Sequence, residues 1–298
     1  MQKLIKKQWF AVLCAVFCTV LWGSAYPVIK YGYAQMNMTA VADKLMFAGV
    51  RFTLAGLMVL VFAWVRNRRF PTVPRERAGG VMLYGVLQTG LMYIFNYIGV
   101  ANTTATKTSV ITAASGFFAV LFASLFFKGE KLTVLKIVGV LVGMGGILLV
   151  NTDSLGGFSL MGEGLVLLST LLNTAGSFVG KRVSGGIVME ATGWQLTVGG
   201  VLILLVALIM GGSYPLSFVS LWTVLYLAFV SAAAFTLWTA LLVHHEAGKI
   251  LVFNMLIPIT GAIWSFFILG ERQMLEPMFL LSLLLTVAGI VMVNVRKS

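Results

Sequence analysis

The chain has few charged residues. Only 10% of its 298 residues are Asp, Glu, Lys or Arg, whereas a soluble globular protein carries about 25%. Hydrophobic residues make up 59%, and the mean hydropathy is +0.99. No water-soluble core can bury such an excess, so the composition excludes a soluble enzyme and a nucleic-acid binder. Because a membrane-spanning helix needs roughly 20 apolar residues, the length accommodates about ten such helices with short loops. The sequence predicts a polytopic all-α membrane protein.

Cysteine is scarce as well. Cys14 and Cys18 lie one helical turn apart in the first apolar run. This arrangement indicates buried or lipid-facing thiols rather than a disulfide, metal or haem site, and we expect neither a metal nor a cofactor. The apolar run from Trp9 to Ile29 follows three lysines, as in a signal peptide. It is too long for a cleaved hydrophobic region, so we interpret it as the first spanning helix.

Acidic residues are missing from the interior of the apolar runs. All nine Asp and Glu residues fall at predicted helix ends or in loops. A carrier of hydrophobic cations, or a proton antiporter of the small multidrug type, typically uses an intramembrane carboxylate. The sequence therefore favours a neutral, zwitterionic or anionic cargo.

Hydropathy and its interruptions predict ten spanning helices. Their approximate ranges are 9–30, 43–65, 79–101, 104–127, 132–151, 161–181, 189–210, 219–242, 248–269 and 276–294. Trp and Tyr recur near the ends of these ranges, as in interfacial aromatic belts.

The basic residues predict the orientation. With the N-terminus in the cytoplasm, 16 of the 21 Lys and Arg residues face inside, and five lie outside or in outer helix halves: Lys30, Lys44, Arg51, Lys107 and Arg272. This bias places both termini in the cytoplasm of a prokaryotic-type inner membrane. The net charge of +12 then reflects orientation rather than a polyanionic partner. We expect Arg51 to snorkel or to form a structural hydrogen bond, and Lys30 and Lys181 to anchor helix ends at the interface.

The two halves of the chain share an ordered set of motifs, which predicts two repeats over residues 1–152 and 153–298. The matched segments are Phe126–Glu130 with Phe267–Glu271, Gly145–Asn151 with Ala288–Asn294, Arg51–Leu57 with Gln195–Val201, and Lys30 with Lys181. Each half contains five predicted helices, an odd number, so the second is inverted relative to the first. Inverted repeats with a substrate site at their interface are typical of secondary transporters.

This duplication resembles the EamA-type transporters of the drug/metabolite transporter superfamily. The Gly-Glu pairs that close spans four and nine, and the matched small-residue runs of spans two, five, seven and ten, carry the resemblance over nearly the whole chain. It implies that spans 1, 3, 4, 6, 8 and 9 surround a central cavity and that small metabolites such as amino acids are exported. The chain departs from the family pattern at Phe117, which matches Pro258 of span nine.

Polar and aromatic side chains form stripes along the cavity spans, at spacings that keep them on one helix face. The candidate substrate-binding residues are Trp22, Tyr26, Tyr93, Asn96, Thr112, Asn173, Ser177, Trp238, Asn254 and Pro258. Pro258 is expected to free a carbonyl group in span nine. Lys107 begins span four without an adjacent acid and is a candidate for attracting an anion at the outer mouth.

The favoured function is alternating-access export of a small neutral or zwitterionic metabolite, with no catalytic residues. Exchange of an anionic metabolite, such as a sugar phosphate or nucleotide sugar, is the alternative, and it would depend on Lys107, Lys30 or Lys181. A membrane-embedded enzyme using His244, His245 and Glu246 is a further alternative, although adjacent histidines point about 100° apart on a helix and form no two-ligand face. A membrane scaffold that transports nothing is the last alternative function. The sequence indicates neither cargo identity, coupling ion, flux direction nor oligomeric state.

Overall fold

The computed structural model describes residues 2–104, 107–108, 111–112, 114–149, 158–272 and 275–295. These residues are almost entirely helical and include no strand. In chain order the elements are α1 (Gln2–Ile5), α2 (Gln8–Gln35), α3 (Val41–Asn67), α4 (Arg75–Gly85), the π-helix η1 (Val86–Leu91), α5 (Met92–Ala101), α7 (Ser115–Phe126), α8 (Val134–Leu149), the π-helix η3 (Leu160–Gly164), α9 (Leu165–Val183), α10 (Val188–Ile209), α11 (Phe218–His244), α12 (Ala247–Leu251), the 3-10 helix η4 (Val252–Leu256), α13 (Ile257–Leu269) and α14 (Pro277–Asn294).

Among the described residues, seven helical segments are long and apolar enough to cross a membrane. They are α2, α3, the continuous segment Arg75–Ala101, α10, α11, the segment Ala247–Leu269 and α14, while α7 and α8 are shorter apolar helices. Most of the predicted spans begin within a few residues of the observed helices, whereas span four was expected from residue 104 and α7 begins at Ser115. Helix α2 continues to Gln35, five residues beyond its expected end. The extra turn is held by aromatic packing of Tyr31 on Trp222 and Tyr33 on Phe47. The predicted repeat boundary at 152/153 lies outside the described residues.

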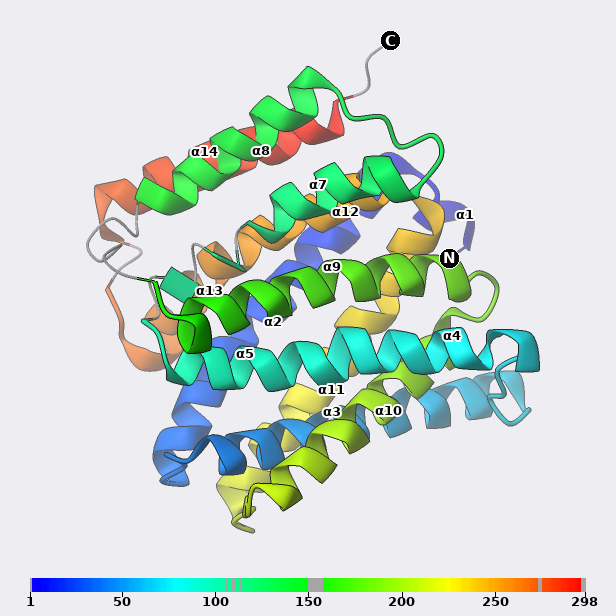
Figure 1. Cartoon of the computed structure of the whole chain (residues 1–298), viewed down its shortest axis with the longest axis vertical. Helices are drawn as coiled ribbons and strands as arrows, with labels where there is room; N and C mark the ends of the chain where they lie inside the picture. Colours follow the sequence, from blue (N-terminus) through cyan, green and yellow to red (C-terminus); the bar gives the residue numbers. More distant parts are fainter. Residues whose placement is uncertain are drawn as a thin grey trace.

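Two helix pairs lie at opposite margins of the bundle. Figure 1 shows α8 beside α14 at one margin and α3 with α10 at the other, with α2, α9 and α13 between them. Both marginal pairs are antiparallel: Gly139 faces Gly289 and Gly146 faces Ser282 in one, while Gly49 faces Leu204 and Gly56 faces Thr197 in the other. These pairs frame the central helices that carry most of the candidate residues.

Small residues allow the marginal helices to approach closely. A Cβ atom added at Gly200 of α10 would lie 2.4 Å from the backbone nitrogen of Thr53 in α3, and one at Gly289 of α14 would lie 2.3 Å from the carbonyl oxygen of Gly139 in α8. Helices in lipid associate through van der Waals packing because lipid tails are as apolar as the side chains. Glycine is therefore needed at these contacts to bring the backbones together.

Alanine substitutions at the neighbouring residues Gly145 and Gly146 of α8 test the close packing of α8 on α14. A Cβ atom at Gly146 would lie 2.8 Å from the carbonyl oxygen of Ser282, whereas one at Gly145 would meet nothing within 4 Å. We expect Gly146→Ala to reduce the free energy of unfolding by about 1–3 kcal/mol through overpacking. Gly145→Ala should leave it unchanged or raise it by up to about 1 kcal/mol, since Ala has the higher helix propensity. Thermal unfolding of the detergent-purified variants measures both effects, and equal melting temperatures would contradict the packing argument.

Candidate transport site

Five aromatic side chains from four helices meet in the centre of the bundle. This aromatic cluster consists of Trp22 on α2, Phe52 on α3, Tyr93 on α5, and Phe235 and Trp238 on α11. Ring centroids lie 4.9 Å apart for Trp22 and Trp238, 5.4 Å for Trp22 and Phe235, 6.4 Å for Phe52 and Phe235, and 4.3 Å for Phe52 and Tyr93. The structure thus brings together three predicted site residues, Trp22, Tyr93 and Trp238. Together the rings form a continuous apolar surface inside the bundle.

Tyr26 lies one helical turn beyond Trp22 on α2. Tyr26 is 57% exposed, and a Cβ atom added at Gly261 of α13 would lie 3.7 Å from its ring, so the two helices approach each other here. Tyr97 continues the aromatic row from Tyr93 and accepts a hydrogen bond from the hydroxyl of Tyr33 at 3.2 Å. Phenol groups from α2 and α5 therefore extend the aromatic cluster.

The predicted amides of spans three and six pair with partners on the facing helix. The Nδ2 of Asn96 donates to Ser169 Oγ at 3.4 Å. Gln88 Nε2 donates to Asn173 Oδ1 at 2.6 Å, and Gln88 Oε1 accepts from Ser177 Oγ at 3.2 Å. The sequence analysis did not select Gln88 as a site residue. It lies in η1, and π-helical turns within spanning helices are frequent at functional sites.

Asn254 and Pro258 lie where span nine changes its helix type. Asn254 is half-buried in η4, and Pro258 occupies the first turn of α13. The expectation of a freed carbonyl is wrong for Asn254, four residues before Pro258, because its carbonyl oxygen accepts a hydrogen bond from the backbone N–H of Ile257. The 3-10 geometry supplies this replacement for the N–H that proline lacks. Thr112 is a half-buried helical residue.

Lys107 has an acidic partner, contrary to the expectation from its sequence neighbours. Its Nζ lies 2.8 Å from Glu163 Oε1, and both side chains are largely buried. Glu163 also accepts hydrogen bonds from Thr103 Oγ1 and from the backbone N–H of Ser159. The sequence did not predict this ion pair, because Glu163 lies at the start of span six, far from Lys107 along the chain. Its carboxylate compensates the charge that was expected to attract an anion.

Arg51 does not snorkel. Its side chain is 4% exposed, and its guanidinium carbon lies 4.2 Å from the ring centroid of Phe52 and 5.7 Å from that of Tyr93. The expectation of snorkelling is therefore wrong, because helix packing of α3 against α5 and α10 encloses this residue. The alternative expectation, a structural hydrogen bond, agrees with the side-chain hydrogen bond between Arg51 and Tyr93. Arg51 adjoins the aromatic cluster.

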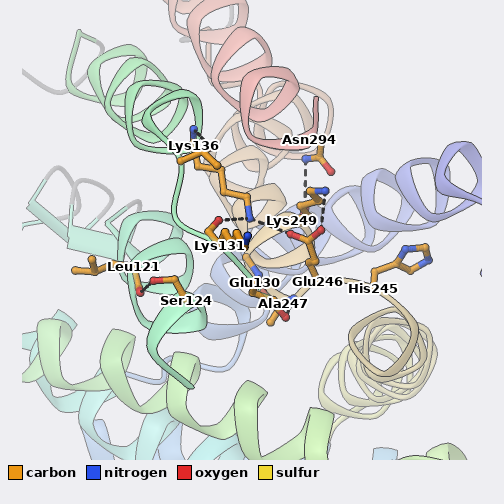
Figure 2. Close-up of polar contacts among 12 residues, drawn as sticks. Leu121, Ser124, Glu130, Lys131, Lys136, His245, Glu246, Ala247, Lys249 and Asn294 are labelled. Carbon is orange, nitrogen blue, oxygen red and sulfur yellow. Dashed lines mark hydrogen bonds and ion pairs between the residues drawn. The ribbon is translucent and has the colours of Figure 1, made fainter. Parts of the chain in front are cut away.

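A second polar network closes one end of the bundle. Glu130, which follows α7, is 6% exposed and accepts hydrogen bonds from Lys181 Nζ at 2.9 Å and from the backbone N–H groups of Ala247 and Gly248 at 2.7 and 3.1 Å. Figure 2 shows Glu130 beside Ala247 at the start of the segment that forms span nine. The sequence analysis assigned no site role to this Gly-Glu turn. The structure shows that its carboxylate joins three chain segments.

Glu246 continues the same network. It lies 2.9 Å from Lys136 Nζ and 2.8 Å from Lys249 Nζ, while Asn294 Nδ2 donates to the carbonyl oxygen of Lys249 (Figure 2). Burial raises the pKa of the Glu246 carboxyl, but hydrogen bonds from the two ammonium groups outweigh burial, and the net pKa is lower than usual. The carboxylate therefore stays ionised and links α8 to α12, while the Lys249 carbonyl group links α12 to α14.

The opposite end carries the counterpart of the Glu130 pair. Lys30, at the end of span one, forms an ion pair with Glu271, which follows α13. These side chains are 68% and 39% exposed, respectively. Lys30 and Glu271 are the residues that the sequence matches with Lys181 and Glu130. Each lysine therefore contacts the glutamate of the other half of the chain.

His244 and His245 border a cavity beside the Glu130 pair. The cavity has a volume of about 440 Å³ and is lined by Phe126, Phe127, Lys128, Gly129, Glu130, Lys181, Arg182, Val243, His244, His245 and Glu246. His245 Nε2 lies 2.7 Å from the carbonyl oxygen of Ile5, so this ring ties α1 to the bundle. No group of three or more metal-ligating side chains occurs within the described ranges.

The chain is similar to several bacterial transporters. It is 29% identical over 205 residues to the "Uncharacterized inner membrane transporter YedA" of Escherichia coli K12, a match that covers 68% of this chain and only 62% of YedA. It is 26% identical to the "Uncharacterized transporter YvbV" of Bacillus subtilis, covering 96% of this chain and 92% of that protein. It is also 26% identical to the "Probable amino-acid metabolite efflux pump" of E. coli K12, covering 87% and 86%. These names indicate a transporter rather than an enzyme.

The fold has a counterpart among solved structures. A crystal structure at 15% sequence identity superposes with a TM-score of 0.79 and covers 94% of this chain and 95% of that one. At this identity the likeness shows the fold alone. The profile of the EamA-like transporter family matches residues 9–152 and 160–295, which together make up nearly the whole chain. The chain therefore belongs to the EamA-like transporter family, the family indicated by its duplicated motifs.

Proposed function

We propose that this transporter exports small neutral or zwitterionic metabolites, such as amino acids, by alternating access. The observation that carries the proposal is the aromatic cluster, which lies beside polar side chains inside the bundle. Within the described ranges, none of the ion pairs or hydrogen bonds of an Asp or Glu carboxylate involves this cluster. The relative named an amino-acid metabolite efflux pump supports the cargo class, and the relative named an inner membrane transporter supports the location.

In the proposed architecture, ten spans form two inverted repeats of five. The contacts support this symmetry because matched spans pair with each other: α3 with α10, and α8 with α14. Span one packs on α11, and its counterpart α9 packs correspondingly on α4, η1 and α5. Both termini lie on the cytoplasmic side in this arrangement, and Figure 1 shows α1 and the last turn of α14 toward the same end of the bundle.

The proposed cargo site lies between these halves. The aromatic cluster packs on the apolar body of the cargo, while hydroxyl and amide groups bind its polar groups. The contributing residues are the predicted set: Trp22, Tyr26, Tyr93, Asn96, Thr112, Asn173, Ser177, Trp238, Asn254 and Pro258. Because Asn96 and Asn173 already hydrogen-bond to protein partners, cargo binding exchanges these hydrogen bonds rather than creating new ones.

Two ion pairs, Glu130–Lys181 and Glu271–Lys30, are called the reciprocal ion pairs because each joins one half of the chain to the other. They serve as gates in this mechanism. The Glu130–Lys181 pair closes the cytoplasmic end and the Glu271–Lys30 pair closes the outer end. Because each pair joins the two halves, rocking of one half against the other breaks one pair and keeps the second. The buried carboxylate of Glu130, with its two backbone donors, makes the cytoplasmic closure the more stable one.

Exchange of an anionic metabolite has less support. It requires Lys107, Lys30 or Lys181 to attract the anion, and each of these lysines contacts a glutamate. An incoming anion would therefore have to displace a carboxylate.

Cargo binding is tested by thermal shift and by counterflow in liposomes. We expect an amino acid to raise the melting temperature of the detergent-purified protein by mass action. In Trp238→Ala or Asn96→Ala, the amino-acid concentration that gives half of the maximal shift should rise at least about tenfold. Trp238→Phe keeps an aromatic ring in the buried position and should retain part of the shift. Trp64→Ala is the matched control because Trp64 is exposed on α3, away from the aromatic cluster. Stabilisation by organic cations only would contradict the proposed cargo class.

The gate is tested with a cysteine reporter at Val243, which lines the cavity beside Glu130. In a background with Cys14 and Cys18 replaced by alanine, Glu130→Gln should increase the labelling rate of Val243→Cys by about tenfold or more, since an uncompensated buried ammonium disfavours closure. Lys30→Gln removes the exposed pair and should change this rate by less than about fivefold. A rate unchanged by Glu130→Gln would contradict the gate.

A further inference from the structure

Arg51 is a buried charge in the middle of the apolar bundle. Only 4% of its surface is exposed, and its Nε atom has no hydrogen-bond partner. The rings of Phe52 and Tyr93 lie against the guanidinium, and the Tyr93 side chain hydrogen-bonds to it, but neither residue supplies a negative charge. A charge in this position is costly in a membrane and marks a functional site.

The described part of the chain supplies no counter-charge. None of its ion pairs involves Arg51. The acids lie at helix ends or in loops and six of them contact other partners: Asp43 with Ser213, Glu130 with Lys181, Glu163 with Lys107, Glu190 with Asn67, Glu246 with Lys136 and Lys249, and Glu271 with Lys30. Arg51 therefore differs from the paired lysines in having no carboxylate partner among these residues.

The matching position in the second half shows that the fold does not need a charge here. Gln195 aligns with Arg51 in the repeated motif and is fully buried in α10. Its Oε1 accepts a hydrogen bond from Thr89 Oγ1 at 2.8 Å, so it interacts with span three as a neutral group. Gln195 makes the corresponding helix contact without a charge, although its Nε2 has no hydrogen-bond partner in the described part of the chain. The charge of Arg51 therefore calls for another explanation.

We propose that Arg51 binds the carboxylate of the cargo. The guanidinium group presents its donors in a planar fork that matches a carboxylate, and the cargo supplies the missing negative charge. This assignment rests on the proposed export function and narrows its substrate class to metabolites with a free carboxylate. It also places a residue of span two in the binding site, alongside the cavity spans expected from the family.

The surroundings of Arg51 suit the rest of such a ligand. Phe52 and Tyr93 connect Arg51 to the aromatic cluster, and the indole Nε1 of Trp22 in that cluster is a second buried donor without a partner. The Tyr93 ring centroid lies 5.7 Å from the guanidinium carbon, and the Tyr93 side chain hydrogen-bonds to Arg51. The site thus combines a cation, an unpaired donor and an apolar wall, which together fit an amino acid with an apolar side chain.

Arg51→Gln tests the proposal, because glutamine stands at the matched position of the other half. The probes are the 20 standard L-amino acids, the corresponding L-amino acid amides, glucose and glucose 6-phosphate, used in thermal-shift titrations of the full-length protein. We expect the wild type to be stabilised by one or more amino acids and much less by their amides. In Arg51→Gln, the amino-acid concentration that gives half of the maximal stabilisation should rise at least about 30-fold. This is the effect expected when one partner of a buried charged pair is lost. Stabilisation by the amide should stay within about threefold of the wild type.

Two further measurements separate ligand binding from a structural role. The ligand-free Arg51→Gln protein should melt at the same or a higher temperature than the wild type, because an uncompensated buried charge is removed. A structural role predicts a lower melting temperature and an equal loss of acid and amide binding, and that result would overturn the proposal. Arg51→Lys keeps the charge without the planar fork and should restore part of the preference for acids over amides. No restoration by Arg51→Lys would contradict a charge-based site.

The outcomes also distinguish this proposal from the proposed function. If amino acids stabilise the wild type and Arg51→Gln equally, amino-acid binding stands and the role of Arg51 is wrong. If no amino acid stabilises the wild type and none shows counterflow, the proposed function fails, and the carboxylate assignment fails with it. Stabilisation by glucose 6-phosphate but not by glucose or any amino acid would overturn both in favour of the anionic alternative.

Discussion

The lack of water in the bilayer is the constraint on which the rest of the structure depends. Backbone N–H and C=O groups must be satisfied within the chain, which favours helices, and polar side chains must find partners inside the bundle. Thr174 and Thr239 donate to carbonyl oxygens of their own helices, and Gln88 bonds to Asn173 across a helix interface. Some buried polar atoms depart from this rule, including Trp22 Nε1, Gln195 Nε2 and Arg51 Nε, which have no hydrogen-bond partner among the described residues. Of these three groups only Arg51 carries a charge, and this makes it the proposed ligand-binding group.

Close backbone packing forms the margins of the bundle. The glycines of α8 with α14 and of α3 with α10 let these helices meet at distances that a Cβ atom would prevent. Central helices are joined differently: α2, α5 and α11 meet through aromatic rings, and η1 and α9 through amides. Ring and amide contacts can be exchanged with a ligand, whereas contacts between backbones cannot. This difference explains why the candidate residues lie on the central helices.

The two reciprocal ion pairs have unequal energetic weight. Lys30 and Glu271 are exposed to solvent, where an ion pair contributes little. Glu130 is buried and accepts two backbone hydrogen bonds besides that of Lys181, so loss of any partner leaves a costly unpaired group. The neighbouring bonds of Glu246 to Lys136 and Lys249 strengthen the same end. One end of this protein is therefore held more firmly than the other.

The sequence by itself determined the class, the approximate helix ranges and the family, because hydropathy and short motifs are local properties. It also selected Trp22, Tyr93 and Trp238, each from a stripe of polar and aromatic residues on one face of its own span. Only the tertiary structure decided the partners: Lys30 meets Glu271 across 241 positions, Lys107 meets Glu163, and Phe52 joins the aromatic cluster. The burial of Arg51 was missed for the same reason. Partner choice depends on which helix faces pack together, and a single sequence does not specify that packing.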